Sequence, residues 1–107
     1  MMKLFISYST QDGIITKDLL SHVKNFYSKY GNCYIDLLDN DSIDKQKRVY
    51  LELYKADILI LLHTPASDKS KWVQKEIYIA YKRNIPIIIV NNSNLKMLLH
   101  SHKLKTI

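Results

Sequence analysis

The chain has 107 residues, a length that suits one domain and leaves no room for two. Apolar residues make up 47% of it, which is enough for a packed core and excludes a disordered protein. The formal net charge of +6 permits an acidic partner, but the lysines are spread along the chain as on solvated helix faces. We therefore predict one domain over residues 1–107.

Cys33 is the single cysteine, so neither an internal disulfide nor a paired-cysteine metal site can form. The histidines show no metal-ligand spacing with it, and we expect no metal. No signal peptide is visible, and the longest apolar runs are far too short to span a bilayer. We expect a cytoplasmic protein that makes no membrane contact.

Short apolar runs alternate with amphipathic stretches along the whole chain. In chain order they predict a strand over residues 3–9, a helix over 12–29, a strand over 33–38, a helix over 42–55, a strand over 57–63, a helix over 70–84, a strand over 86–90, one or two helical turns over 95–100 and a short strand over 104–107. Ser42 or Asp41 is the expected cap of the second helix.

This alternation implies parallel strands with helices on both faces of the sheet. The runs 58–62 and 86–90 are apolar throughout, as expected of central strands that are covered on both sides. Right-handed crossovers then favour the strand order 2-1-3-4, with a short fifth strand. The predicted fold is α/β: a flavodoxin-like three-layer α/β/α sandwich with a parallel four- to five-stranded sheet.

Glu76 is an acid on the apolar side of the predicted helix 70–84. At about 100° per residue it falls with Val73, Ile77 and Ala80 rather than on the wet side. No basic residue stands three or four positions away to pair with it. A buried carboxylate is costly without partners, so Glu76 either bonds to another element or faces a ligand at the strand ends. Partial burial would raise its pKa.

Two neighbours of Glu76 on the same helix allow a structural and a functional interpretation. Trp72 is either a large core or rim side chain, or a wall for a planar ligand group. Ser70 is the expected N-cap of the helix, a role that is compatible with lining a pocket. The polar residues at the carboxyl ends of the first and second predicted strands, among them Ser9, Thr10 and Asp36, lie at the same predicted edge of the sheet.

These residues resemble those of a Toll/interleukin receptor (TIR) domain of the small prokaryotic kind. FISYSTQD at 5–12 is similar to the first box of the family, and YID at 34–36 to its second strand. Residues 56–77 resemble the third strand and the following helix, including the arrangement S-x-W-x-x-x-E, and PIIIV at 86–90 resembles the fourth strand. The resemblance covers about the first 90 residues.

The resemblance implies a flavodoxin-like fold and, in enzymatic members, cleavage of NAD at the nicotinamide–ribose bond in bacterial or phage-related immune signalling. Glu76 is then the catalytic residue and Trp72 stands beside the nicotinamide. The substrate-binding set implied by the resemblance is Ser9, Thr10, Asp36, Ser70 and Trp72. NAD is the substrate of such a NAD glycohydrolase or ADP-ribosyl cyclase, and no cofactor is implied.

A second hypothesis is a non-catalytic TIR-like module that acts by homotypic association. Other TIR domains, in a homo-oligomer, are expected partners in either case. Binding of FMN is a weaker alternative, because the loop 9–13 has the polar character of a phosphate loop without its pattern. A nucleic-acid partner is not expected, since the tyrosines fall in strands and helix faces rather than on an aromatic platform.

Overall fold

The computed structural model describes residues 1–91 and places four parallel strands in one sheet, in the order β2-β1-β3-β4. The strands are β1 (Lys3–Ser7), β2 (Asn32–Tyr34), β3 (Ile58–Leu62) and β4 (Ile87–Val90). This is the predicted flavodoxin-like order. The chain adds strands to one side of β1 and then to the other, so the switch in strand order lies between β1 and β3. The elements predicted at 95–100 and 104–107 lie outside the described residues.

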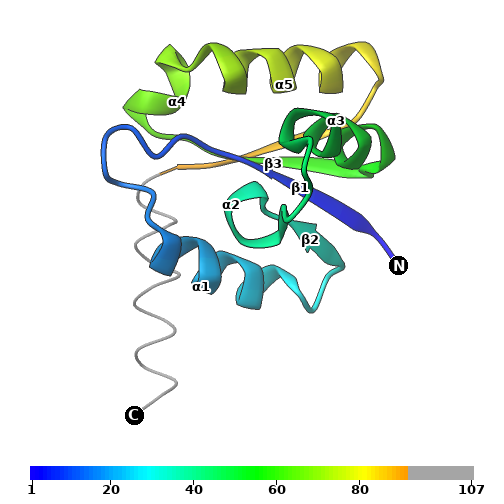
Figure 1. Ribbon diagram of the computed structural model, residues 1–107, viewed down its shortest axis with the longest axis horizontal. Helices are drawn as coiled ribbons and strands as arrows, with labels where there is room; N and C mark the ends of the chain where they lie inside the picture. The colour runs from blue at the N-terminus through cyan, green and yellow to red at the C-terminus, as the bar shows by residue number, and fades with distance from the viewer. Residues whose placement is uncertain (92–107) are drawn as a thin grey trace.

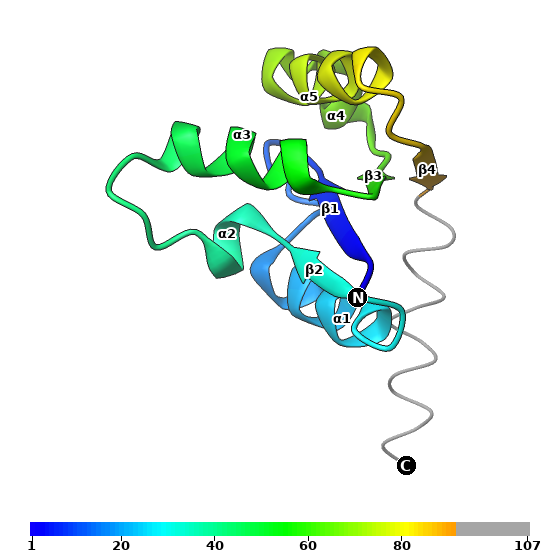
Figure 2. The ribbon, with the colours of Figure 1, turned by 90° about the vertical axis from the view of Figure 1, so that its right-hand side faces the viewer.

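Helices cover both faces of this sheet and complete the three layers (Figures 1 and 2). They are α1 (Lys17–Tyr27), α2 (Asp36–Asp39), α3 (Lys45–Lys55), α4 (Pro65–Lys69) and α5 (Lys71–Lys82). Figure 1 shows α1 on one side of the sheet and α5 on the other, and Figure 2 shows α3 on the same side as α5. Within residues 1–91, no helix has the length and apolarity needed to cross a membrane.

Two hydrophobic clusters, one on each face, hold the layers together. Because side chains alternate along a strand, Leu4 and Ile6 of β1 join the cluster under α1, while Phe5 joins the one under α3 and α5. Val23 of α1 is fully buried in the first cluster, and Val73 of α5 in the second. Ser7 has the same phase as Phe5, so it points to the face that α5 covers.

Two short helices were not predicted, and one of them corrects the second strand. β2 ends at Tyr34, and α2 begins at Asp36, so the strand predicted over 33–38 is wrong in its second half. α4 is likewise a separate helix of five residues, closed by a capping box between Thr64 and Ser67. Helices of four or five residues are too short to show a helical period in the sequence.

The long helices begin later than predicted, at residues whose side chains cap them. Thr16 Oγ1 accepts a hydrogen bond from Leu19 N at 3.1 Å, and residues 12–15 are loop. Asp44, rather than Ser42 or Asp41, caps α3 by accepting a bond from Lys47 N at 3.0 Å. Each start is set by the acceptor that stands three residues before a free backbone N–H.

The prediction of a covered central strand at 86–90 stays a prediction, because the elements predicted to follow it, at 95–100 and 104–107, lie outside the described residues. β4 is an edge of the described sheet, with Ile88 and Ile89 exposed. An apolar run alone does not separate a central strand from an edge strand.

Candidate functional site

Glu76 lies on the side of α5 that faces the sheet, where its side chain is only 6% exposed. Its neighbours on that side, Val73 and Ala80, are fully buried. Glu76 Oε1 accepts a hydrogen bond from Ser7 Oγ at 2.8 Å, at the carboxyl end of β1. The predicted position on the apolar side is confirmed, and the carboxylate finds a partner in the sheet.

Burial raises the pKa of the Glu76 carboxyl to about 7, because the charged form loses its hydration. The Ser7 hydrogen bond opposes this rise, the charge of Asp36 adds to it, and hydrogen bonding from the Trp72 side chain opposes it. Both protonation states of Glu76 are therefore populated near neutral pH. A carboxyl tuned in this way is characteristic of groups that bind or stabilise reacting atoms.

Asp36 is the first residue of α2 and lies close enough to Glu76 to act on its charge. Two donors hold its Oδ1: Tyr34 Oη at 2.9 Å and Asn40 Nδ2 at 2.6 Å. The structure thus brings a second predicted site residue, Asp36, to the same edge of the sheet as Glu76. The carboxylate of Asp36 is oriented by the hydroxyl of Tyr34 from β2.

Tyr8 follows Ser7 and adds a phenol to this edge. Its hydroxyl accepts a hydrogen bond from Leu37 N at 3.0 Å, which ties the first strand to α2. Burial raises the pKa of the Tyr8 hydroxyl to about 12, and the charges of Asp36 and Glu76 raise it as well. Tyr8 therefore stays protonated beside the two carboxyls and keeps a proton to donate.

Trp72 stands at the rim of the site, one turn before Glu76, and is 40% exposed. Its ring meets the ring of Tyr50 from α3, with centroids 6.0 Å apart and planes inclined by 39°. Lys75 Nζ lies 5.2 Å from the centroid of the Tyr50 ring, and hydrogen bonding from Lys75 lowers the pKa of the Tyr50 hydroxyl. The pair is an aromatic wall with one cation, suited to a planar ligand group.

Ser9 and Thr10 begin the loop that follows β1. Ser9 is buried, and its hydroxyl accepts a bond from Gln11 N at 3.4 Å, whereas Thr10 is exposed. Asp12 Oδ2 accepts a bond from Ala66 N at 3.0 Å and so fastens this loop to the start of α4. The loop is held at the predicted edge, but its bonds run within itself and to α4 rather than to Glu76.

Ser70 caps α5, as predicted, by accepting a hydrogen bond from Val73 N at 3.2 Å. The cap fixes the first turn of the helix that carries Trp72 and Glu76. A role of Ser70 in binding substrate stays a prediction.

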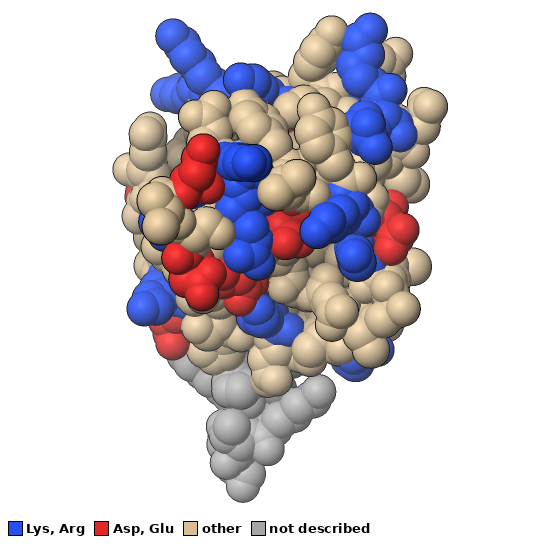
Figure 3. All heavy atoms as spheres, turned by 45° about the vertical axis from the view of Figure 1, so that its right-hand side comes forward, with Lys and Arg blue, Asp and Glu red and all other residues tan. Residues whose placement is uncertain are grey.

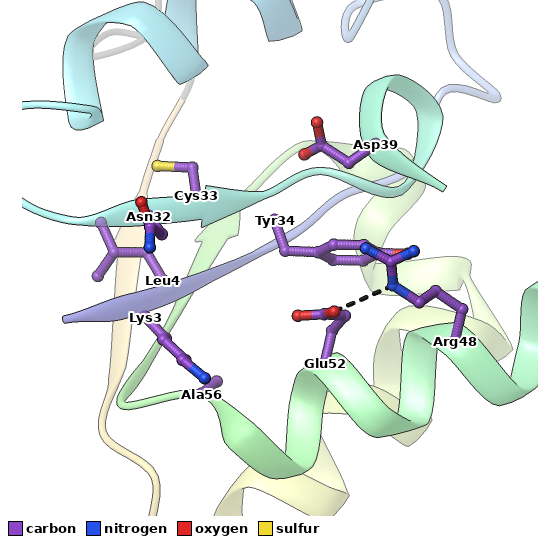
Figure 4. A pocket seen from close by; sticks show the side chains of 9 residues that line it. All are labelled: Lys3, Leu4, Asn32, Cys33, Tyr34, Asp39, Arg48, Glu52 and Ala56. Carbon is purple, nitrogen blue, oxygen red and sulfur yellow. Dashed lines mark hydrogen bonds and ion pairs between the residues drawn. The ribbon is translucent and has the colours of Figure 1, made fainter. Parts of the chain in front are cut away.

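A cavity of about 350 Å³ opens beside β2, on the side of α3, and contains none of the predicted site residues (Figure 4). Its lining is Lys3, Leu4, Asn32, Cys33, Tyr34, Asp39, Arg48, Glu52 and Ala56. Figure 4 shows the Arg48 guanidinium over the Tyr34 ring, 5.5 Å from its centroid, while Arg48 Nε donates to Glu52 at 3.0 Å. Tyr34 lines this cavity and also reaches the Glu76 site, because its hydroxyl donates a hydrogen bond to Asp36.

Three site residues were missed from the sequence: Ser7, Tyr8 and Tyr50. The sequence did hold a signal that Ser7 contacts Glu76. Ser7 is the polar member of an otherwise apolar strand face, and the helical period of α5 directs Glu76 toward the sheet. Tyr8 and Tyr50 carried none, since their roles depend on how α2 and α3 pack against the sheet.

On the face shown in Figure 3, basic and acidic side chains are interspersed rather than gathered into one field. An extended basic stripe is the usual footprint of a nucleic-acid partner, and this face does not show one. Among residues 1–91, no three His, Cys, Asp or Glu side chains come together as metal ligands would.

Comparison with known proteins gives one family. A model of the TIR-like domain of Thoeris protein ThsB matches residues 5–97, which is most of the chain. A search of curated proteins finds no match.

Proposed function

This chain belongs to the family of TIR-like domains of Thoeris protein ThsB, which serves antiphage defence, and on that basis we propose that it binds NAD and cleaves the nicotinamide–ribose bond. The observation that carries the proposal is Glu76: a carboxyl with a pKa of about 7, buried at the carboxyl edge of a parallel sheet beside an aromatic wall. Ligands of such sheets bind at that edge, next to the switch in strand order.

The proposed reaction requires a group that stabilises positive charge on the ribose, and it depends less on an acid that protonates the leaving group. When the bond breaks, its electron pair leaves with nicotinamide, which becomes neutral, and ribose C1′ becomes an oxocarbenium-like centre. The ionised Glu76 carboxylate stabilises this charge and accepts hydrogen bonds from ribose hydroxyls. Water then adds to C1′ and gives up a proton, which yields ADP-ribose; attack by an atom of the same molecule yields a cyclic product.

The remaining side chains have roles that follow from their chemistry. The wall of Trp72 and Tyr50 takes the flat nicotinamide ring, which stacks on aromatic faces. Asp36, held by Tyr34, accepts hydrogen bonds from ribose hydroxyls. Ser9 and Thr10 offer hydroxyls to the polar part of the substrate. Each of these roles belongs to the proposal.

Product analysis tests the proposal. Purified protein is incubated with NAD over a series of protein concentrations, and the products are separated by chromatography and identified by mass. We expect free nicotinamide with linear or cyclic ADP-ribose from the wild type, and far less of each from Glu76→Gln. Asp57→Asn is the matched control, because Asp57 accepts a bond from Lys3 N at the opposite edge of the sheet.

A second candidate function is homotypic association, since TIR-like domains in general interact with other TIR domains. The observation that favours it is the outer surface of α3 and α5, where Tyr54, Tyr78 and Tyr81 are 48%, 58% and 73% exposed. Light scattering on a size-exclusion column measures the mass of the particle. A wild type that associates but releases no nicotinamide at any concentration would leave association as the function.

A further inference from the structure

We propose that Ser7 is a positioning residue for the reaction, and that its hydroxyl fixes the Glu76 carboxylate in the orientation that meets the ribose. This inference rests on the proposed function and deepens it, because it names the group that prepares Glu76. It stands on a buried contact between β1 and α5: Ser7 is 1% exposed, Glu76 is 6% exposed, and Ser7 Oγ donates to Glu76 Oε1 at 2.8 Å.

The place of Ser7 in the sheet explains why its hydroxyl has a fixed direction. Ser7 is the last residue of β1 and pairs with Leu61 of β3, so its backbone is held by the ladder. The phase of the strand sends its side chain under α5, into the face formed by Phe5, Leu61 and Val73. A hydroxyl in this apolar setting gains most by donating to a charged acceptor, where the bond is short and strong.

The bond also leaves Glu76 free to act. A carboxylate offers about four lone-pair sites, and the Ser7 proton occupies one of them. Hydrogen bonding from Trp72 uses the carboxylate as well, and the remaining sites serve ribose hydroxyls or the developing charge at C1′. Holding one oxygen removes rotational freedom from a long side chain before the substrate arrives, which is how a supporting residue speeds a reaction that it does not touch.

Other groups also face Glu76, and each acts on its charge. Asp36 at the start of α2 and the phenols of Tyr8 and Tyr50 interact with it electrostatically, and Trp72 on its own helix bonds to it. Lys75, the cation of this region, is engaged with Tyr50. Among these groups, Ser7 is the neutral donor with a direct bond to a named carboxylate oxygen.

Carbon-13 NMR tests the inference without relying on turnover. The chain has two glutamates, Glu52 and Glu76, so protein labelled at the glutamate δ-carbon gives two carboxyl resonances. Glu76→Gln assigns them, and a pH titration reads the midpoint of Glu76. We expect Ser7→Ala to move this midpoint up by about one pH unit, because the hydrogen bond from Ser7 favours the ionised carboxylate.

The matched variants separate positioning from folding. Ser7→Thr keeps the hydroxyl and is expected to restore the wild-type midpoint, whereas Ser7→Cys keeps the size with a weak donor and is expected to shift it. Val23→Ala lowers stability from the far face of the sheet and is expected to leave the midpoint unchanged. If Ser7→Ala does not fold, Ser7→Cys gives the same reading.

Turnover supplies the second readout. If Glu76 acts ionised, the pH profile of nicotinamide release shifts in parallel with the NMR midpoint, and Ser7→Ala loses roughly fivefold at pH 7. An unchanged Glu76 midpoint in Ser7→Ala and Ser7→Cys would overturn the inference. Absence of nicotinamide release by the wild type, with the NMR shifts intact, would instead overturn the proposed function and leave the Ser7–Glu76 bond standing.

Discussion

Glu76 is the residue at which stability and function oppose one another. Its carboxyl is buried, so ionisation creates a charge that water does not hydrate. Hydrogen bonding from Ser7 and Trp72 compensates for the lost hydration in part. The folded state therefore prefers the protonated form, whereas the proposed reaction uses the ionised one. A pKa of about 7 keeps both forms accessible near neutral pH.

The direction of this pKa shift predicts how stability depends on pH. Between the ordinary value of 4.5 and about 7, the folded state binds more protons at Glu76 than the unfolded state does. The contribution of Glu76 is thus most favourable below about pH 4.5 and is lost as pH rises through 7. We expect a loss of about 3 kcal/mol in the free energy of unfolding across this window.

Urea unfolding at several pH values checks this, with Glu76→Gln as the reference that removes the titrating group while keeping a similar shape. The difference between the two proteins isolates Glu76 from the other carboxyls. Glu76→Gln should be the more stable protein at pH 8. A difference that does not vary between pH 4.5 and 8 would show that Glu76 is not buried as described.

At the scale of elements, the site depends on where α5 begins. Ser70 caps the helix, and the next turns carry Trp72 outward and Glu76 inward. The preceding helix α4 is fastened to the loop after β1 through Asp12 and Ala66. The two polar loops at the carboxyl edge are therefore linked, and the start of α5 is set by a cap rather than by packing alone.

Substitutions at Ser70 separate capping from substrate binding. Ser70→Ala is expected to lower the free energy of unfolding by about 1 kcal/mol, because Val73 N loses its acceptor. Ser70→Asn caps equally well and should restore stability. If the hydroxyl also binds substrate, Ser70→Asn still raises the KM for NAD; an unchanged KM would reduce Ser70 to a cap.

At the scale of the whole molecule, the sheet separates the hydrophobic cluster around the Glu76 helix from the cluster under α1. Val73 in the cluster under α3 and α5 lies on the helix of Glu76, whereas Tyr8 packs against the cluster under α1. Both faces are packed with apolar side chains of similar kind. Damage to either face lowers stability, but only damage under α5 acts directly on the helix that carries Glu76.

Val23→Ala and Val73→Ala make this division measurable. Each removes two methyl groups from a fully buried side chain, and each should lower the free energy of unfolding by about 2 kcal/mol. Only Val73→Ala is expected to slow nicotinamide release, by about tenfold, because α5 settles toward the cavity and shifts Glu76. Equal rates for the two variants, measured below their melting temperatures, would contradict the division.

Much of this architecture could be predicted from the sequence, because strand–helix alternation and right-handed crossovers leave few strand orders. The inward phase of Glu76 followed from the helical period alone. The partner of Glu76 was missed: the sequence shows that Ser7 is a polar side chain on the face of β1 that α5 covers, but which acid it meets depends on how the two faces pack. The sequence predicts strand for the first three residues of α2, because the apolar Leu37 and Leu38 extend the run of β2 and hide the turn.

The most direct test of the central claim compares nicotinamide release by the wild type and by Glu76→Gln at pH 8, where the carboxyl is mostly ionised. Circular dichroism and urea unfolding first establish that both proteins are folded. We expect the wild type to release nicotinamide from NAD and Glu76→Gln to be slower by at least about a hundredfold, the size of effect seen when a charge-stabilising group is removed. Equal rates for the two folded proteins would contradict the account.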